Sequence, residues 1–328
     1  MSDEHEKPGL LDVIGDLATS LDGIPAPIKR NLLKAAGALV TGLVDVPAAF
    51  LEMKAAQFKA RQSGHQAVMS AAARNAAALA GKSPEIADRA LEYFANDLVR
   101  EQANREAIVK QAIDATNALF SPSPAGDIPP IDDDWLHQFR KLASSKSNAE
   151  VQVILGRILA GEIHKPGSFA PYTLEAVARL DQSTAQAFEF VANHAFIIPD
   201  RWDIIVLSVL GEDGVGLEPL LNPSVTLHLT SCGLVTSSGL SQIAPEAFLL
   251  PHAYTLGGQR VLFEKCEVEN KRNLMMPMKG DAALLSVAGG QLQSIVPKTF
   301  DRAYARKLQT GLKRLGVTMI FPDINIDA

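Results

Sequence analysis

Residues 131–180, IDDDWLHQFRKLASSKSNAEVQVILGRILAGEIHKPGSFAPYTLEAVARL, decide the fold of the chain around them. The three aspartates at 132–134 can accept hydrogen bonds from the free N–H groups of a first helical turn and suit its positive dipole end. The apolar residues Trp135, Phe139 and Leu142 then recur at spacings of four and three. This spacing predicts a helix with one buried stripe.

The same stretch predicts two further helices. Ser147 and Glu150 have the spacing of a capping box, which favours a helix start there and an end near Gly161. Lys165–Ser168 predicts a turn, because proline cannot continue a helix and glycine accepts a positive φ. The third helix carries Leu174 on its apolar face. Together the signals predict a helical core unit over residues 131–198.

Three runs within this unit resemble the signature of a bacterial family of proteins of unknown function, domain-of-unknown-function family 2806. They are DDDWLHQF (132–139), GRILAGEIHKPGSF (156–169) and TLEAVARL (173–180). The stretch REQANRE (100–106) is also similar to the family pattern. The helical core distantly resembles the Abi-alpha proteins of bacterial abortive infection, which implies, by analogy, a role in defence against phage.

Composition favours a cytoplasmic protein with more than one domain. The 328 residues are 47% hydrophobic, enough to bury a sizeable core, and the formal net charge is −6. A protein that binds nucleic acid through phosphates needs a basic face, so this charge makes nucleic acid an unlikely partner. The two cysteines lack metal-ligand spacing and are expected to be reduced thiols.

Residues 1–51 form an N-terminal apolar or amphipathic segment. Leu32–Leu51 has nearly the length of a membrane span, but Lys34, Asp45 and Pro47 interrupt it. A span needs about 20 mostly apolar residues. We therefore expect a buried or oligomer-forming helix here, with peripheral contact at the inner membrane as the alternative.

Residues 52–120 predict a long αα-hairpin. Its first half is rich in alanine, and its second half begins at Pro84 and carries apolar stripes on both sides of the polar REQANRE stretch. Residues 121–130, SPSPAGDIPP, predict a proline-rich linker.

Residues 199–328 predict a winged-helix-like module and give the chain its α+β class. Helices are expected over 202–210, 217–221 and 225–232, followed by a β-hairpin, the wing, around Gly257 and Gly258. No lysine or arginine occurs from Trp202 to Gln259, which favours protein docking over DNA binding. A final helix precedes the apolar strand 317–321, expected to pair with the wing or with another chain.

No catalytic, cofactor or metal motif is evident, so we expect a protein that is not an enzyme and needs no cofactor. Glu162 and Ser168 lack a nucleophile elbow, and the seven histidines lack local ligand spacing. The polar stretches instead suggest an interaction surface. Its candidate residues are Arg100, Glu101, Gln102, Asn104, Arg105, Glu162, Lys165 and Ser168.

Two functional hypotheses follow, from different classes. The first is a helical assembly protein that forms a homo-oligomer or binds another protein, in anti-phage defence or stress response. The second is a membrane-associated effector of the abortive-infection type that acts through Leu32–Leu51. A transcriptional regulator is third.

Overall fold

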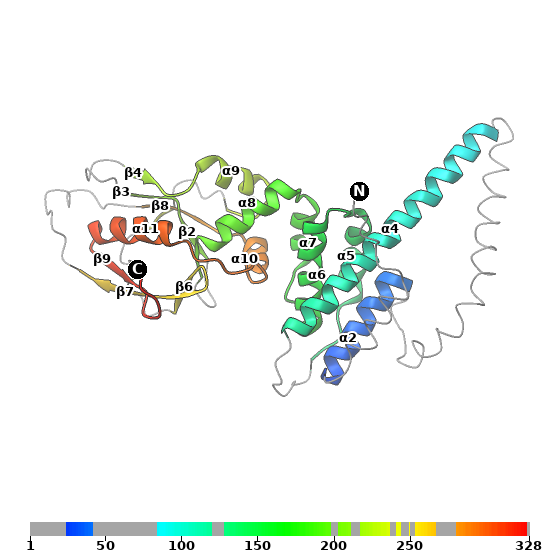
Figure 1. Cartoon of the computed structure of the whole chain (residues 1–328), viewed down its shortest axis with the longest axis horizontal. Helices are drawn as coiled ribbons and strands as arrows, with labels where there is room; N and C mark the ends of the chain where they lie inside the picture. Colours follow the sequence, from blue (N-terminus) through cyan, green and yellow to red (C-terminus); the bar gives the residue numbers. More distant parts are fainter. Residues whose placement is uncertain are drawn as a thin grey trace, which may run out of the picture. The chain divides into compact units, whose positions relative to one another are not determined.

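The computed structural model describes residues 24–41, 84–119, 128–197, 203–210, 217–236, 241–243, 249, 253–266 and 280–326. The chain divides into two compact units, residues 1–169 and 170–328. The first unit is helical, and the second combines an antiparallel sheet with helices (Figure 1). The predicted α+β class is confirmed. The division lies within the predicted core unit 131–198, whose boundaries stay a prediction, as do those of the other four segments.

Helices packed side by side make up the described part of the N-terminal unit (Figure 1). α4 and α6 share the most extensive contact, and α5 and α2 also pack on them. The elements are α2 (Ala26–Ala36), the π-helical turn η1 (Gly37–Thr41), α4 (Pro84–Leu119), α5 (Asp133–Ser145) and α6 (Ala149–His164).

The helix starts predicted at 132–134 and at Ser147 hold to within a residue. Asp132 caps α5, since its Oδ1 accepts the N–H of Trp135 at 2.8 Å. α6 is capped by Asn148, which accepts the N–H groups of Glu150 and Val151, so the predicted Ser147 capping box is wrong. An asparagine at the N-cap accepts these bonds as well as serine does. The indole N–H of Trp135 donates to the Phe169 carbonyl at 2.6 Å and thereby ties α5 to the end of the unit.

α2 is buried in the helical unit. Leu32 and Leu39 are each 1% exposed. Three polar side chains of α2 donate to backbone carbonyls of the segment before α5: Arg30 to Ile128, Asn31 to Pro129 and Lys34 to Ile131. The described part of the predicted apolar segment, residues 32–41, therefore belongs to the core, as expected. None of the described helices is long and apolar enough to cross a membrane.

The alanine-rich half of the predicted αα-hairpin, residues 52–81, lies outside the described residues, as do residues 42–51 and the linker residues 121–127. The second half is confirmed as α4, which begins at Pro84 as predicted.

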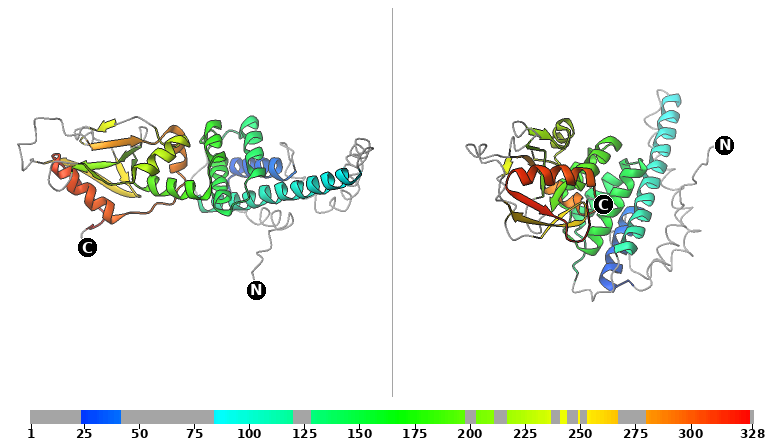
Figure 2. Two further views of the ribbon diagram at one scale, coloured as in Figure 1. Left: turned by 90° about the horizontal axis from the view of Figure 1, so that it is seen from above. Right: turned by 60° about the vertical axis from the view of Figure 1, so that its left-hand side comes forward.

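Seven of the strands in the described part of the C-terminal unit form an antiparallel sheet, in the order β5-β8-β2-β1-β6-β7-β9. α11 packs against β9, the two drawn in orange-red and red in Figure 2, and it also contacts β3 of the small β3–β4 sheet. The strands are β1 (Ala195–Ile197), β2 (Ile204–Val206), β3 (Ser208–Leu210), β4 (Leu217–Pro219), β5 (Ser241–Ile243), β6 (Tyr254–Leu256), β7 (Gln259–Lys265), β8 (Gly280–Leu284) and β9 (Val317–Ile320). The helices are α7 (Pro171–Ala178), α8 (Gln182–Asn193), α9 (Pro223–Ser231), α10 (Val287–Gln293) and α11 (Arg302–Arg314).

The winged-helix prediction is not confirmed, although two of the elements it included are present. The helices predicted over 202–210 and 217–221 are wrong, since β2 and β3 occupy the first range and β4 the second. Ile204, Ile205 and Val206 are β-branched and favour a strand, and so short an apolar run carries no reliable period. The predicted helix near 225–232 and the hairpin around Gly257 and Gly258 are confirmed as α9 and β6–β7. β9 pairs with β7, as expected.

Candidate interaction surface

The N-terminal half of α4 is an exposed helical arm. It extends beyond α2, α5 and α6, most clearly at its cyan end (Figure 1). Its large apolar side chains are open to solvent: Tyr93 is 72% exposed, Phe94 48%, Leu98 42% and Val99 70%. A helix of 36 residues is about 54 Å long, and the 16 residues of α6 cover only about 24 Å. α6 is therefore too short to cover the whole of α4.

The exposed arm repeats the face that is buried further along the same helix. Residues 18 apart are separated by about five full turns and lie on one face. Ala90, Phe94 and Leu98 thus stand directly above Ile108, Ala112 and Thr116, which are 0%, 0% and 1% exposed. One face of α4 is consequently covered by its own chain in the lower half and open in the upper half.

In the lower half this face packs closely against a helix. Gly156 of α6 lies so near to α4 that a Cβ there would be 2.4 Å from the Cβ of Gln111. Small residues allow two helices to approach in this way. The face of α4 is therefore shaped to accept another helix at short distance.

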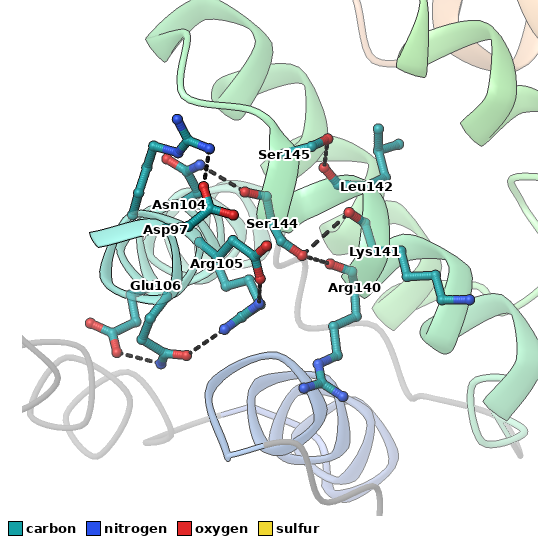
Figure 3. Close-up of polar contacts among 12 residues, drawn as sticks. Asp97, Asn104, Arg105, Glu106, Arg140, Lys141, Leu142, Ser144 and Ser145 are labelled. Carbon is teal, nitrogen blue, oxygen red and sulfur yellow. Dashed lines mark hydrogen bonds and ion pairs between the residues drawn. The ribbon is translucent and has the colours of Figure 1, made fainter. Parts of the chain in front are cut away.

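The REQANRE stretch marks the point where the covered half begins. Arg100 pairs with Asp97 of its own helix, and its side chain is 63% exposed. Gln102 donates to the carbonyl of Val40 in η1 at 3.1 Å. Arg105 donates to the Oε1 of Gln102 at 2.9 Å and also contacts Glu101 at 3.3 Å. Gln102 therefore links the base of the arm to η1, and Arg105 belongs to the same group of polar contacts on α4 (Figure 3).

Asn104 connects the same stretch to α5. It is 1% exposed, and its Nδ2 donates to the carbonyl of Ser144 at 2.8 Å (Figure 3). Its Oδ1 accepts from Gln152 of α6 at 3.4 Å. Buried amides stabilise a fold when their hydrogen bonds are satisfied. Asn104 of α4 therefore connects this helix to α5 and α6. Among the candidate residues of REQANRE, Arg100 is the one whose side chain is most exposed to solvent.

The other three candidates form the turn that ends the unit. Glu162, 1% exposed, accepts the N–H of Gly167 at 2.6 Å and that of Phe169 at 3.2 Å. Ser168 donates its hydroxyl to the Lys165 carbonyl at 2.5 Å, and the Lys165 side chain is exposed. Gly167 has φ 85°, which favours glycine. Glu162 is ten residues, about 15 Å, beyond Gln152 on α6, so the structure does not bring the two candidate groups together.

Burial raises the pKa of Glu162 above its ordinary value of 4.5, although hydrogen bonds from Gly167, Phe169 and Ser168 lower it. The folded state then holds this proton more tightly than the unfolded chain does. Stability should therefore fall as the pH rises from about 4.5 through the folded pKa and become constant above it.

Glu162→Gln should remove this pH dependence and lower the stability of the unit by about 1–2 kcal/mol, because an amide NH₂ replaces one of two accepting oxygens. Urea unfolding at a series of pH values tests both effects, with the exposed Glu92→Gln as the control. An unchanged pH slope in Glu162→Gln would contradict the assignment.

The structure also shows a pair that the sequence did not indicate, between the buried His194 and Asp301, whose side chain is 41% exposed. His194 lies with its Nε2 3.2 Å from Asp301 Oδ2, and its Nδ1 donates to the Phe190 carbonyl at 2.6 Å. Burial raises the pKa of Asp301, but the N–H of Tyr304 and the His194 side chain outweigh it, so the pKa is lowered overall. The two residues are 107 positions apart, and no local pattern connects them.

This pair serves the fold of the C-terminal unit. The Tyr304 hydroxyl donates to the carbonyls of His194 and Val206, each at 3.2 Å, and Asp301 caps α11. The two hydrogen bonds of Tyr304 connect α11 to the end of α8 and to β2. Among the described residues, no group of three or more histidine, cysteine, aspartate or glutamate side chains could hold a metal ion.

Comparison with known proteins gives one match. A family model described as a protein of unknown function (DUF2806) matches residues 88–308. No curated protein and no solved structure matches the chain. The matched range begins in the arm of α4 and ends in α11.

Proposed function

The chain belongs to the DUF2806 family of proteins of unknown function, and from that premise we propose that it is an interaction protein, not an enzyme, that binds a helix of another polypeptide on the exposed arm of α4. The observation that carries the proposal is the five-turn repeat of one face. Ala90, Phe94 and Leu98 repeat the positions of Ile108, Ala112 and Thr116, which are already covered.

The energetics favour occupation of this face. Burying a phenylalanine or leucine side chain contributes about 2 kcal/mol, and the arm exposes both kinds on one stripe. Soluble monomers rarely leave such contiguous apolar surface open without a partner. Arg100 is an exposed charge at the lower end of the arm, but it is about 200° around the helix from Leu98 and so lies outside the stripe.

A double substitution tests the proposal. Phe94→Glu with Leu98→Glu should abolish complex formation, since losing about 4 kcal/mol corresponds to an affinity at least about 100-fold weaker. Folding should be little affected, because both side chains are exposed. The measurement is the native mass of the full chain in a gentle cell extract.

The wild type should appear above its monomer mass of 35.1 kDa and the double variant at that mass. Glu92→Lys, on the opposite face of the arm, is the matched control and should behave as the wild type. A wild type at 35.1 kDa, unchanged in both variants, would refute the proposal.

Anti-phage defence or stress response is the biological setting that the resemblance to Abi-alpha proteins suggests for this interaction. The membrane-effector alternative is less favoured, because Leu32 and Leu39 are buried in the helical core. A transcriptional regulator is also less favoured, since the chain has no lysine or arginine from Trp202 to Gln259, a range that includes α9.

A further inference from the structure

We infer that the basic face of α11 is a second docking surface, and that its partner is an acidic segment of another polypeptide. This helix belongs to the C-terminal unit, so the inference goes beyond the function proposed for the arm of α4. Five residues of α11 are basic and none is acidic. The five are Arg302, Arg306, Lys307 and Lys313, which are exposed, and Arg314, which is half-buried.

The basic side chains of α11 lie on the side of the helix that faces away from the core. At 100° per residue they occupy an arc of about 140°, and the buried Tyr304, Leu308 and Leu312 lie on the opposite side. Two small residues, Ala303 and Thr310, occupy the middle of this arc, with basic residues on either side of them. A partner segment can therefore lie along α11 for about 20 Å and reach positive charges on both sides.

The strands on which α11 packs add no negative charge to this surface. Neither β9 nor β3 contains an aspartate or a glutamate. Asp301, which precedes α11, contacts His194, and Asp323, which follows β9, contacts Arg260. The face of α11 is therefore a concentrated positive charge that these strands do not offset.

The distribution of charge over the chain favours a short acidic segment as the partner. Since the whole chain has a formal net charge of −6 and α11 contributes five positive charges, the remaining residues have a net charge of −11. A DNA duplex or an anionic membrane extends well beyond the length of α11 and would meet this negative charge. An acidic polypeptide segment can place its carboxylates against α11 alone. The three arginines can each bind a carboxylate through two parallel N–H groups.

Fluorescence anisotropy of a labelled peptide tests the inference. The probe is a fluorescein-labelled peptide of about 20 residues built from the repeat Glu-Glu-Ala-Glu-Gly, and the same peptide with glutamine in place of glutamate is the neutral control. The full chain is titrated into each peptide at about 50 mM NaCl. We expect saturable binding of the glutamate peptide, at least about 10-fold weaker at about 500 mM NaCl, because salt screens exposed charges.

Charge substitutions on α11 locate the binding site. Lys307→Glu with Lys313→Glu should weaken the affinity at least about 10-fold, and Lys307→Gln with Lys313→Gln should weaken it less, because more of the positive charge remains. Both lysines are exposed, so folding should be little affected. Lys141→Glu with Arg179→Glu reverses two exposed charges outside α11. This matched control should bind the peptide within about twofold of the wild type.

Four outcomes would overturn the inference. They are no binding of the glutamate peptide, equal binding of the glutamine peptide, equal affinity in the Lys307→Glu/Lys313→Glu variant, and tighter binding of another polyanion. The polyanions to compare are a DNA duplex of about 20 base pairs and vesicles with about 30% phosphatidylglycerol. The arm variant Phe94→Glu with Leu98→Glu should bind the peptide as the wild type does, so a failure of the proposed function would leave this result unchanged.

Discussion

Replacing Gly156 by alanine should destabilise the helical unit by about 2 kcal/mol, although alanine is the better helix former. The new Cβ would lie 2.4 Å from the Cβ of Gln111, 2.9 Å from its carbonyl carbon and 3.0 Å from the backbone nitrogen of Ala112. These atoms belong to the backbone of α4 or are bonded directly to it, so a change of side-chain rotamer cannot move them away. Such overpacking costs about 3 kcal/mol, which exceeds the gain of about 1 kcal/mol in helix propensity.

Urea unfolding followed by the fluorescence of Trp135 measures this loss, in a Trp202→Phe background that leaves one reporter in the helical unit. A loss of about 2 kcal/mol corresponds to a Tm lower by about 6 °C. Gly161→Ala provides a graded comparison, because its Cβ would meet only the ring edge of Phe169 at 2.7 Å and should cost less. A Gly156→Ala variant as stable as the wild type would contradict the close approach of α4 and α6.

Replacing Gly289 by alanine should have a still larger effect on the C-terminal unit, about 3 kcal/mol or more. A Cβ there would lie 2.1 Å from the carbonyl oxygen of Leu234, which also accepts the N–H of Ser286 at 3.0 Å. The carbonyl cannot move without losing that hydrogen bond. The loop after α9 would therefore separate from the start of α10.

The neighbouring Gly290 offers a matched control in the same helix. A Cβ at Gly290 would be 3.3 Å from Asp203 Oδ2, a side-chain atom that can shift. Gly290→Ala should remain within about 1 kcal/mol of the wild type, because its gain in helix propensity offsets the crowding. Hydrogen exchange at the Ser286 amide should accelerate in Gly289→Ala and not in Gly290→Ala. Equal exchange in both variants would rule out the clash.

The long helices could be predicted from the sequence because their signals are local. Asp132 caps the helix it precedes, and Pro84 begins a helix of 36 residues whose apolar period is unmistakable. The short strands at 204–206 and 208–210 could not be predicted, because a run of three residues has no reliable period. Their pairing with β8 and β4 decides their conformation.

In the candidate site, too, the sequence indicates some features and the tertiary structure decides the others. Its polar residues were visible in REQANRE, but the sequence does not show which of them face inward. Asn104 is buried because the end of α5 lies beside it, and Arg100 is exposed because no described helix reaches that far along α4. The His194–Asp301 pair had no local signal at all, since 107 residues separate its members.

By itself the sequence determined the α+β class, the family signature and the helices of residues 131–180, because capping and helical period act within a few residues. The tertiary structure alone decided which part of the apolar face of α4 is covered. The period of that face is uniform from Ala90 to Thr116, and the shorter α6, whose Gln152 near its start contacts Asn104, covers only the part of α4 that follows the arm.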